Sequence, residues 1–213
     1  MSKDPIIKLF EENPDTLELL GRVWELLYIE SSTPDIGKRR ENFLKLLLRY
    51  EFGFIVEDAP DTERFWDFRI KINQDWYHYN MKTAEKAGTI KVAWDGFPSV
   101  ERAESFSFKY PILYIVGNRS VKRIEVYVFS TELIYEVKNS MEQAKLPFWW
   151  IPKNTTNPRG FGLSSEAVSK LIERSKKERN YVEKTYHFKN SLKKISEEYW
   201  RDWYYLLKKL AGF

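Results

Sequence analysis

The sequence predicts an α/β (α+β) fold in which a central mixed β-sheet is flanked by helices. Segments whose apolar residues recur at helical spacing lie toward both ends of the chain, whereas segments with strand-like alternation or continuous apolar runs lie in its middle. The chain contains no repeat, low-complexity segment or linker between them. One domain over residues 1–213 is therefore expected.

Two helices are expected before the strands. Leucines and Trp24 recur at helical spacing across residues 15–29, and Pro14 is an entry signal for this helix. Residues 38–50 carry a second apolar stripe, with Glu41 beside three basic residues in the first turns. Both helices have one apolar face to bury against the sheet.

The strands follow. Residues 65–72 and 76–83 alternate between apolar and polar side chains and are joined by a short turn, which predicts a β-hairpin. If Asn73 and Gln74 are the central turn residues, Asp67 lies directly opposite Asn80. Further strands are expected at residues 89–94, 109–116 and 123–130. The continuous apolar run within 109–116 predicts a strand covered on both faces.

The remaining segments are predicted from their caps and composition. Residues 131–144 are expected to form a helix, residues 147–162 an ordered loop rich in Pro and Gly, and residues 165–181 a helix capped by a serine. An aromatic amphipathic helix closes the chain at residues 191–213. Its aromatic residues favour burial in the core, with a dimer interface or base stacking as alternatives.

Composition restricts the possible chemistry. The 213 residues include no cysteine and only two histidines, which excludes a disulfide framework, a thiolate zinc site, a catalytic thiol and a histidine-rich metal centre. The formal charge of +4 permits a nucleic-acid partner without requiring one. Because neither a signal peptide nor a membrane span is visible, a soluble cytoplasmic protein is expected.

The predicted hairpin brings Asp67, Asn80 and Lys82 to one face of the sheet. A carboxylate, an amide carbonyl and an ammonium group are suited to Mg²⁺-assisted hydrolysis of a phosphodiester bond. The alternative is an ordinary cross-strand ion pair between Asp67 and Lys82.

These residues resemble the PD-(D/E)XK nuclease signature, in particular the Asn-x-Lys-Thr variant found in some type II restriction endonucleases, over roughly residues 38–130. The resemblance implies a restriction-endonuclease-like fold, with Asp67 as metal ligand, Lys82 as catalytic lysine and Glu41 reaching the site from the preceding helix. The sequence departs from the pattern in two places. Phe65-Trp66 stands where the family often has proline, and Asn80 replaces the usual acidic residue.

Because Asn80 brings no negative charge, the expected metal set is Asp67, Asn80 and Glu41, with Glu51 or Glu57 as alternatives to Glu41. Glu41 has a second interpretation, as a solvated i,i+4 partner, for instance of Lys45.

DNA contacts are expected from the Pro- and Gly-rich loop and from the turn between the last two expected strands. Arginine and asparagine can pair with guanine and adenine, and lysines can contact phosphates. The alternative for the loop is an ordinary surface loop held by Pro and Gly. The candidates are Lys153, Asn154, Thr155, Thr156, Asn157, Arg159, Arg119 and Lys122.

The function predicted from these features is that of a type II restriction endonuclease, a homodimer that uses Mg²⁺ to cut double-stranded DNA at a short, palindromic site. A structure-specific or repair nuclease of the same fold is one alternative. A non-catalytic nucleic-acid-binding protein is the other.

Overall fold

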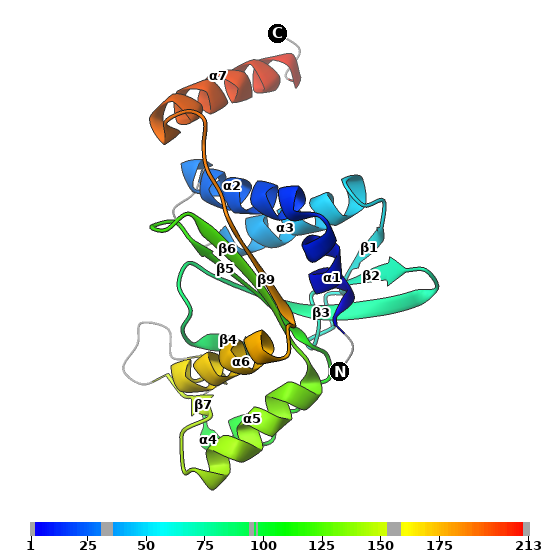
Figure 1. Cartoon of the computed structure of the whole chain (residues 1–213), viewed down its shortest axis with the longest axis vertical. Helices are drawn as coiled ribbons and strands as arrows, with labels where there is room; N and C mark the ends of the chain where they lie inside the picture. Colours follow the sequence, from blue (N-terminus) through cyan, green and yellow to red (C-terminus); the bar gives the residue numbers. More distant parts are fainter. Residues whose placement is uncertain (1–2, 31–35, 94–95, 97, 153–158, 211–213) are drawn as a thin grey trace.

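The computed structural model describes residues 3–30, 36–93, 96, 98–152 and 159–210. The helices and strands of this part follow one another in chain order from α1 to α7 (Figure 1). Their bounds are α1 (Pro5–Glu12), α2 (Pro14–Glu30), α3 (Ile36–Tyr50), β1 (Ile55–Asp58), β2 (Phe68–Ile72), β3 (Asp75–Ala84), β4 (Ile90–Ala93), α4 (Val100–Glu104), β5 (Ile112–Asn118), β6 (Arg123–Phe129), α5 (Thr131–Gln143), β7 (Trp149–Trp150), β8 (Phe161–Leu163), α6 (Ser165–Lys177), β9 (Tyr181–Thr185) and α7 (Leu192–Leu210).

The central sheet has six strands in the order β1-β2-β3-β5-β6-β9. All neighbours are antiparallel except β3 and β5, which run parallel, so the sheet is mixed as predicted. The parallel pair requires a long crossover, and β4 and α4 lie in that connection. A second, three-stranded sheet is formed by β4, β8 and β7.

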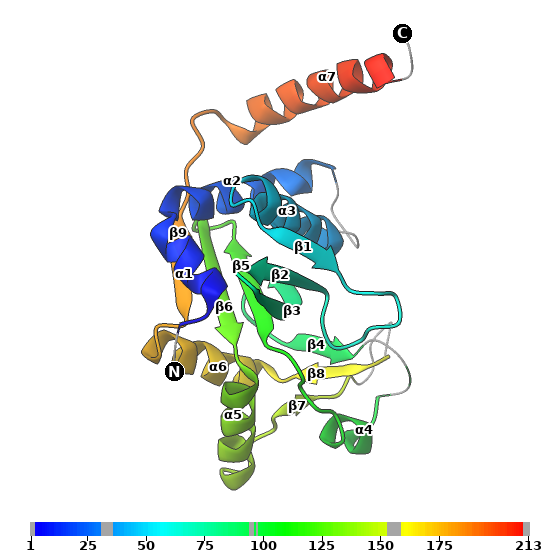
Figure 2. The same cartoon turned by 90° about the vertical axis from the view of Figure 1, so that its right-hand side faces the viewer.

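Two apolar cores cover the two faces of the central sheet. Along β5, Leu113 and Ile115 pack with α1, α2 and α3, whereas Ile112, Tyr114 and Val116 pack with α5, α6 and the small sheet. Figure 2 shows the helices on opposite sides of the sheet. The continuous apolar run of β5 is thus explained by burial on both faces, which confirms the prediction for this strand.

The structure contains several elements that were not predicted from the sequence. The first is α1, whose N-cap Asp4 accepts a hydrogen bond from the Ile6 backbone N–H and whose first position is Pro5. Such a cap followed by proline is a recognised start signal. The other missed elements are β1, α4, β7, β8 and β9.

Two predicted segments, a loop and a helix, differ from the structure for physical reasons. The expected loop 147–162 contains β7 and the start of β8, and Gly162 lies so close to β4 that a Cβ there would meet the Ile90 carbonyl oxygen at 2.2 Å. The helix expected to reach residue 181 ends at Lys177, because Arg179 has a φ of 55°. The chain then enters β9 at the edge of the central sheet.

The prediction that the aromatic residues of the last helix lie in the core is wrong. In α7, Trp200 and Trp203 are each 42% exposed and Tyr204 is 58% exposed. Figures 1 and 2 show α7 standing clear of the layer formed by α2 and α3. Neither α7 nor any other helix in the described part of the chain is long and apolar enough to cross a membrane.

Candidate active site

The β2–β3 hairpin has the predicted register. The pairs run from Phe68 opposite Tyr79 to Ile72 opposite Asp75. Asp67 lies one residue before β2 and continues the ladder, since its backbone N–H donates to the Tyr79 carbonyl oxygen at 2.8 Å. The hairpin therefore fixes the backbone of Asp67 next to β3.

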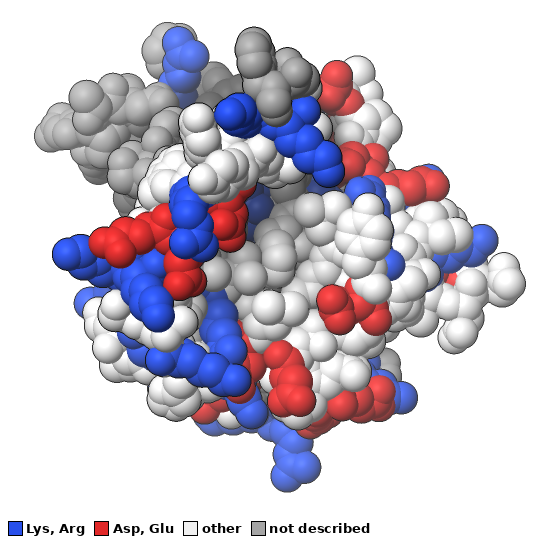
Figure 3. All heavy atoms as spheres, turned by 90° about the horizontal axis from the view of Figure 1, so that it is seen from above, with Lys and Arg blue, Asp and Glu red and all other residues white. Residues whose placement is uncertain are grey.

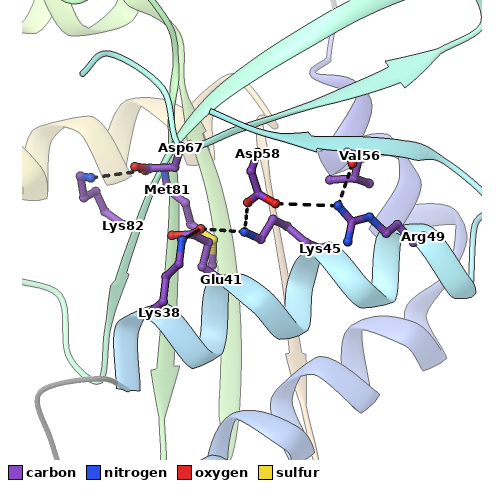
Figure 4. Close-up of polar contacts among 9 residues, drawn as sticks. All are labelled: Lys38, Glu41, Lys45, Arg49, Val56, Asp58, Asp67, Met81 and Lys82. Carbon is purple, nitrogen blue, oxygen red and sulfur yellow. Dashed lines mark hydrogen bonds and ion pairs between the residues drawn. The ribbon is translucent and has the colours of Figure 1, made fainter. Parts of the chain in front are cut away.

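The Asp67 carboxylate is held by two contacts. Its Oδ2 accepts a hydrogen bond from the Met81 backbone N–H at 2.6 Å and lies 3.5 Å from Lys82 Nζ. The predicted ion pair therefore exists, and Figure 4 shows both side chains on the sheet side of the site.

Glu41 reaches the same region from α3. Its Oε1 accepts hydrogen bonds from Lys38 at 2.6 Å and from Lys45 at 3.0 Å. The hydrogen bond to Glu41 raises the pKa of Lys38. The predicted i,i+4 pair with Lys45 is thus present, but it is buried, since the Lys45 side chain is 5% exposed and that of Glu41 13%. Figure 4 shows Glu41 pointing from α3 toward Asp67 and Met81.

Asp67, Lys82 and Glu41 line one cleft of about 520 Å³. The helix α3 forms one wall and β3 and β4 form the other, so residues far apart in the sequence meet there. The cleft also contains more basic than acidic side chains, which suits a polyanionic ligand. Its other polar lining residues are Lys38, Arg40, Thr83, Thr89, Lys91 and Tyr114.

Asn80 is placed apart from these three residues. It lines a separate small cavity of about 10 Å³ with Phe65, Phe106 and Phe108, and it is not among the residues that line the cleft. Its Nδ2 donates to the Phe65 carbonyl oxygen at 3.3 Å, while its buried Oδ1 has no hydrogen-bond partner in the described structure. Metal coordination by Asn80 stays a prediction.

Sequence reasoning missed Asp58, at the end of β1. Lys45 forms ion pairs with both Glu41 and Asp58, and Arg49 lies 3.9 Å from Asp58 Oδ2. Burial alone would raise the pKa of Asp58, but the hydrogen bond and charge of Lys45, with Lys38 and Arg49, lower it overall. This network fixes Glu41 between two lysines (Figure 4). The four residues of β1 carry too little periodicity to have indicated this strand.

The donor set in the cleft suits a hard divalent cation. Mg²⁺ commonly takes one or two carboxylates, together with water and substrate phosphate oxygens. Asp67 and Glu41 supply two carboxylates to one cavity. Within the described ranges, no three His, Cys, Asp or Glu side chains gather in a way that could hold a metal.

The two alternative glutamates lie elsewhere. Glu57 pairs with Arg69, with the Nε atom 2.8 Å from Oε2, and Glu51 is exposed in the turn after α3. Neither lines the cleft. Of the glutamates considered, Glu41 is therefore the one that shares a cavity with Asp67.

The structure describes only some of the residues predicted to contact DNA. Residues 153–157 lie outside the described residues, and Arg159, which follows them, is exposed. Arg119 pairs with Glu85 at 3.0 Å and stacks on Tyr28, with 3.8 Å from its guanidinium carbon to the ring centroid. Contacts of these residues with DNA stay predictions.

Lys122 also has an ion-pair partner within the chain. Lys122 forms an ion pair with Glu25 at the turn between β5 and β6. Figure 3 shows basic and acidic side chains interspersed on the face viewed from above. The net positive charge is therefore not concentrated into one continuous patch on that face.

No protein-family model matches the chain, and no curated protein matches it by sequence. A solved structure described as "Restriction endonuclease in complex with substrate DNA" matches it with a TM-score of 0.67 and 22% sequence identity. The match covers 94% of this chain and 99% of the other. The chain thus has a restriction-endonuclease-like fold, with a central mixed sheet flanked by helices, as the sequence predicts.

Proposed function

We propose that this protein is a Mg²⁺-dependent type II restriction endonuclease that cuts both strands of DNA at a short, palindromic site. The observation that carries the proposal is the convergence of Asp67, Lys82 and Glu41 on one cleft. The fold likeness to a restriction endonuclease bound to DNA supports it, because the PD-(D/E)XK resemblance of the sequence implies the same fold.

Asp67 and Glu41 would hold the divalent ion between the sheet and α3. Bound there, Mg²⁺ would act as a Lewis acid toward the scissile phosphate and help to activate a water molecule. The Met81 N–H fixes the Asp67 carboxylate, and Lys38 and Lys45 fix Glu41. Both carboxylates are thus positioned before any ligand arrives.

Lys82 would act on the reacting groups directly. Its ammonium group lies 3.5 Å from Oδ2 of Asp67, one of the two carboxylates that would hold the ion. It can orient the attacking water and offset the negative charge that develops on the phosphorus oxygens. Cleavage would leave a 5′-phosphate and a 3′-hydroxyl, as the sequence resemblance implies.

A palindromic substrate requires two equivalent active sites, so the proposed enzyme works as a homodimer in the cytoplasm. The exposed Arg159 and the residues 153–157 before it are proposed to contact base edges. Arg119 and Lys122 are proposed to contact phosphates. On binding, a phosphate would replace Glu85 as the partner of Arg119 and Glu25 as the partner of Lys122.

Digestion of sequenced plasmids and bacterial genomic DNA, with Mg²⁺ and with EDTA, tests the proposal. Discrete Mg²⁺-dependent fragments, whose ends map to one short sequence, are expected. A smear or branch-specific nicking would instead indicate the structure-specific or repair nuclease. DNA binding without any cleavage would indicate a binding protein and would overturn the enzymatic proposal.

A further inference from the structure

The helix α7 exposes an apolar stripe. Trp200, Trp203, Leu207 and Leu210 follow one another at intervals of three, four and three residues, so they lie on one face. Each is at least 42% exposed. An exposed apolar helix face of this kind is typical of a surface that another protein element covers.

The rest of the described fold does not use this face. Both core clusters, on either side of the central sheet, are complete without any residue of α7. The helix follows β9 through residues 186–191 and projects away from α2 and α3 (Figure 2). Its apolar stripe is therefore available to a partner.

We propose that α7 pairs in antiparallel orientation with α7 of a second copy of this chain, about a two-fold axis near Trp203. This inference deepens the proposed function, since a palindromic site requires two copies related by two-fold symmetry. It assigns the dimer contact to a particular helix and a particular register.

The charges of α7 favour this register. Glu198 and Glu197 lie five and six residues before Trp203. Lys208 and Lys209 lie five and six residues after it. An antiparallel pair centred on Trp203 therefore brings the acidic pair of each copy to the level of the basic pair of the other. A parallel pair would place acid beside acid and base beside base, which is unfavourable.

The apolar residues also match in this register. Trp203 meets Trp203 of the second copy at the axis, Trp200 lies level with Leu206, and Tyr199 lies level with Leu207. Leu210 lies level with the small Ser196. Large side chains thus oppose smaller ones away from the axis, as close packing of two helices requires.

The test compares two aromatic-to-glutamate changes on the same helix by sedimentation velocity of the full chain without DNA. Trp203→Glu places a charge at the proposed axis. Tyr205→Glu is the matched control, because Tyr205 is 61% exposed and points about 200° around the helix from Trp203. Circular dichroism checks that both variants fold.

The wild type and Tyr205→Glu are expected to be dimers. Trp203→Glu is expected to associate roughly 100-fold more weakly, because aromatic residues at the centre of an interface carry much of its binding energy. A wild type that stays monomeric at all concentrations, or a Trp203→Glu variant that dimerises like the wild type, would overturn the inference.

A charge exchange tests the register. Glu197→Lys with Glu198→Lys forms one variant, and Lys208→Glu with Lys209→Glu forms the other. Each alone is expected to dimerise more weakly than the wild type, and an equal mixture is expected to form a heterodimer. Either variant dimerising alone as strongly as the wild type would contradict the antiparallel register, because a parallel pair of the wild type already places like charges side by side.

These measurements do not depend on catalysis. If the wild type dimerises through α7 but cuts no DNA, the proposed function fails and the dimer stands. If it cuts DNA and Trp203→Glu still dimerises, the proposed function stands and the α7 contact fails.

Discussion

Lys82 Nζ lies 3.5 Å from Asp67 Oδ2, across a hairpin whose register sets this proximity. The same Asp67 oxygen accepts a hydrogen bond from the Met81 N–H, so the carboxylate is held by the strand that carries the lysine. Glu41 completes the cleft from α3. The proposed division of roles among these residues leads to predictions that separate metal binding, chemistry and stability.

Asp67→Asn is expected to reduce Mg²⁺-dependent DNA cleavage by roughly 100-fold or more, because it removes a charged metal ligand while keeping the side-chain shape. Asp75→Asn, at the exposed start of β3, is the matched control and should cut like the wild type. Cleavage rates on a plasmid with a mapped site measure the difference. Equal rates for Asp67→Asn and the wild type would remove Asp67 from the site.

Lys82→Met is expected to lower the single-turnover cleavage rate by about 100- to 1,000-fold, since a positioned charge acts mainly on the transition state. DNA binding, measured by fluorescence anisotropy in Ca²⁺, should change little. Lys71→Met, on the neighbouring strand, serves as the control. An unchanged rate with weakened binding would show that Lys82 only contacts the phosphate backbone.

Glu41→Gln is expected to raise the Mg²⁺ concentration needed for half-maximal cleavage by roughly 10-fold or more, because one of two carboxylates in the cleft loses its charge. Glu51→Gln, outside the cleft, should leave that concentration unchanged. A Mg²⁺ titration of the cleavage rate distinguishes the two glutamates. A larger effect at Glu51 would reverse the assignment.

Asn80→Asp is expected to lower the free energy of unfolding by about 1–3 kcal/mol in the absence of metal, since it replaces the donor to the Phe65 carbonyl with a buried carboxylate. Urea unfolding in EDTA measures this. A variant as stable as the wild type under these conditions would show that Asn80 does not occupy the aromatic cavity.

Asp4 is expected to make stability depend on pH. Burial raises the pKa of Asp4 to about 6, against hydrogen bonds from the Ile6 N–H and the Tyr79 hydroxyl that lower it. Because the folded-state pKa lies above the unfolded value, the stabilisation is fully present below about pH 4 and is lost as the pH rises through about 6.

Asp4→Asn keeps an N-cap acceptor but cannot ionise, so it should remove this dependence and be more stable than the wild type at pH 7 by up to about 3 kcal/mol. Asp15→Asn, exposed in the first turn of α2, is the control. Urea unfolding at pH 4, 5, 6 and 7 provides the comparison. An Asp4→Asn variant with the wild-type pH profile would contradict the assignment to Asp4.

Local pattern was enough to predict much of the fold. The spacing of leucines predicted α2 and α3, the apolar run predicted β5, and turn residues gave the β2–β3 register that places Asp67 beside Lys82. The short elements β1, β7 and β8 were missed, because two to four residues carry too little periodicity to identify a strand. Asp58 was missed with β1.

Other features depend on contacts between distant segments, which residue order does not specify. The sequence determined that Glu41 faces its i,i+4 partner Lys45, but only the packing of α3 against the sheet decided that this glutamate shares a cleft with Asp67. Likewise, the sequence determined that α7 has an apolar face, and only the tertiary structure decided that the chain's own cores leave it uncovered. Periodicity fixes which side chains share a face, whereas burial depends on what the rest of the chain places against that face.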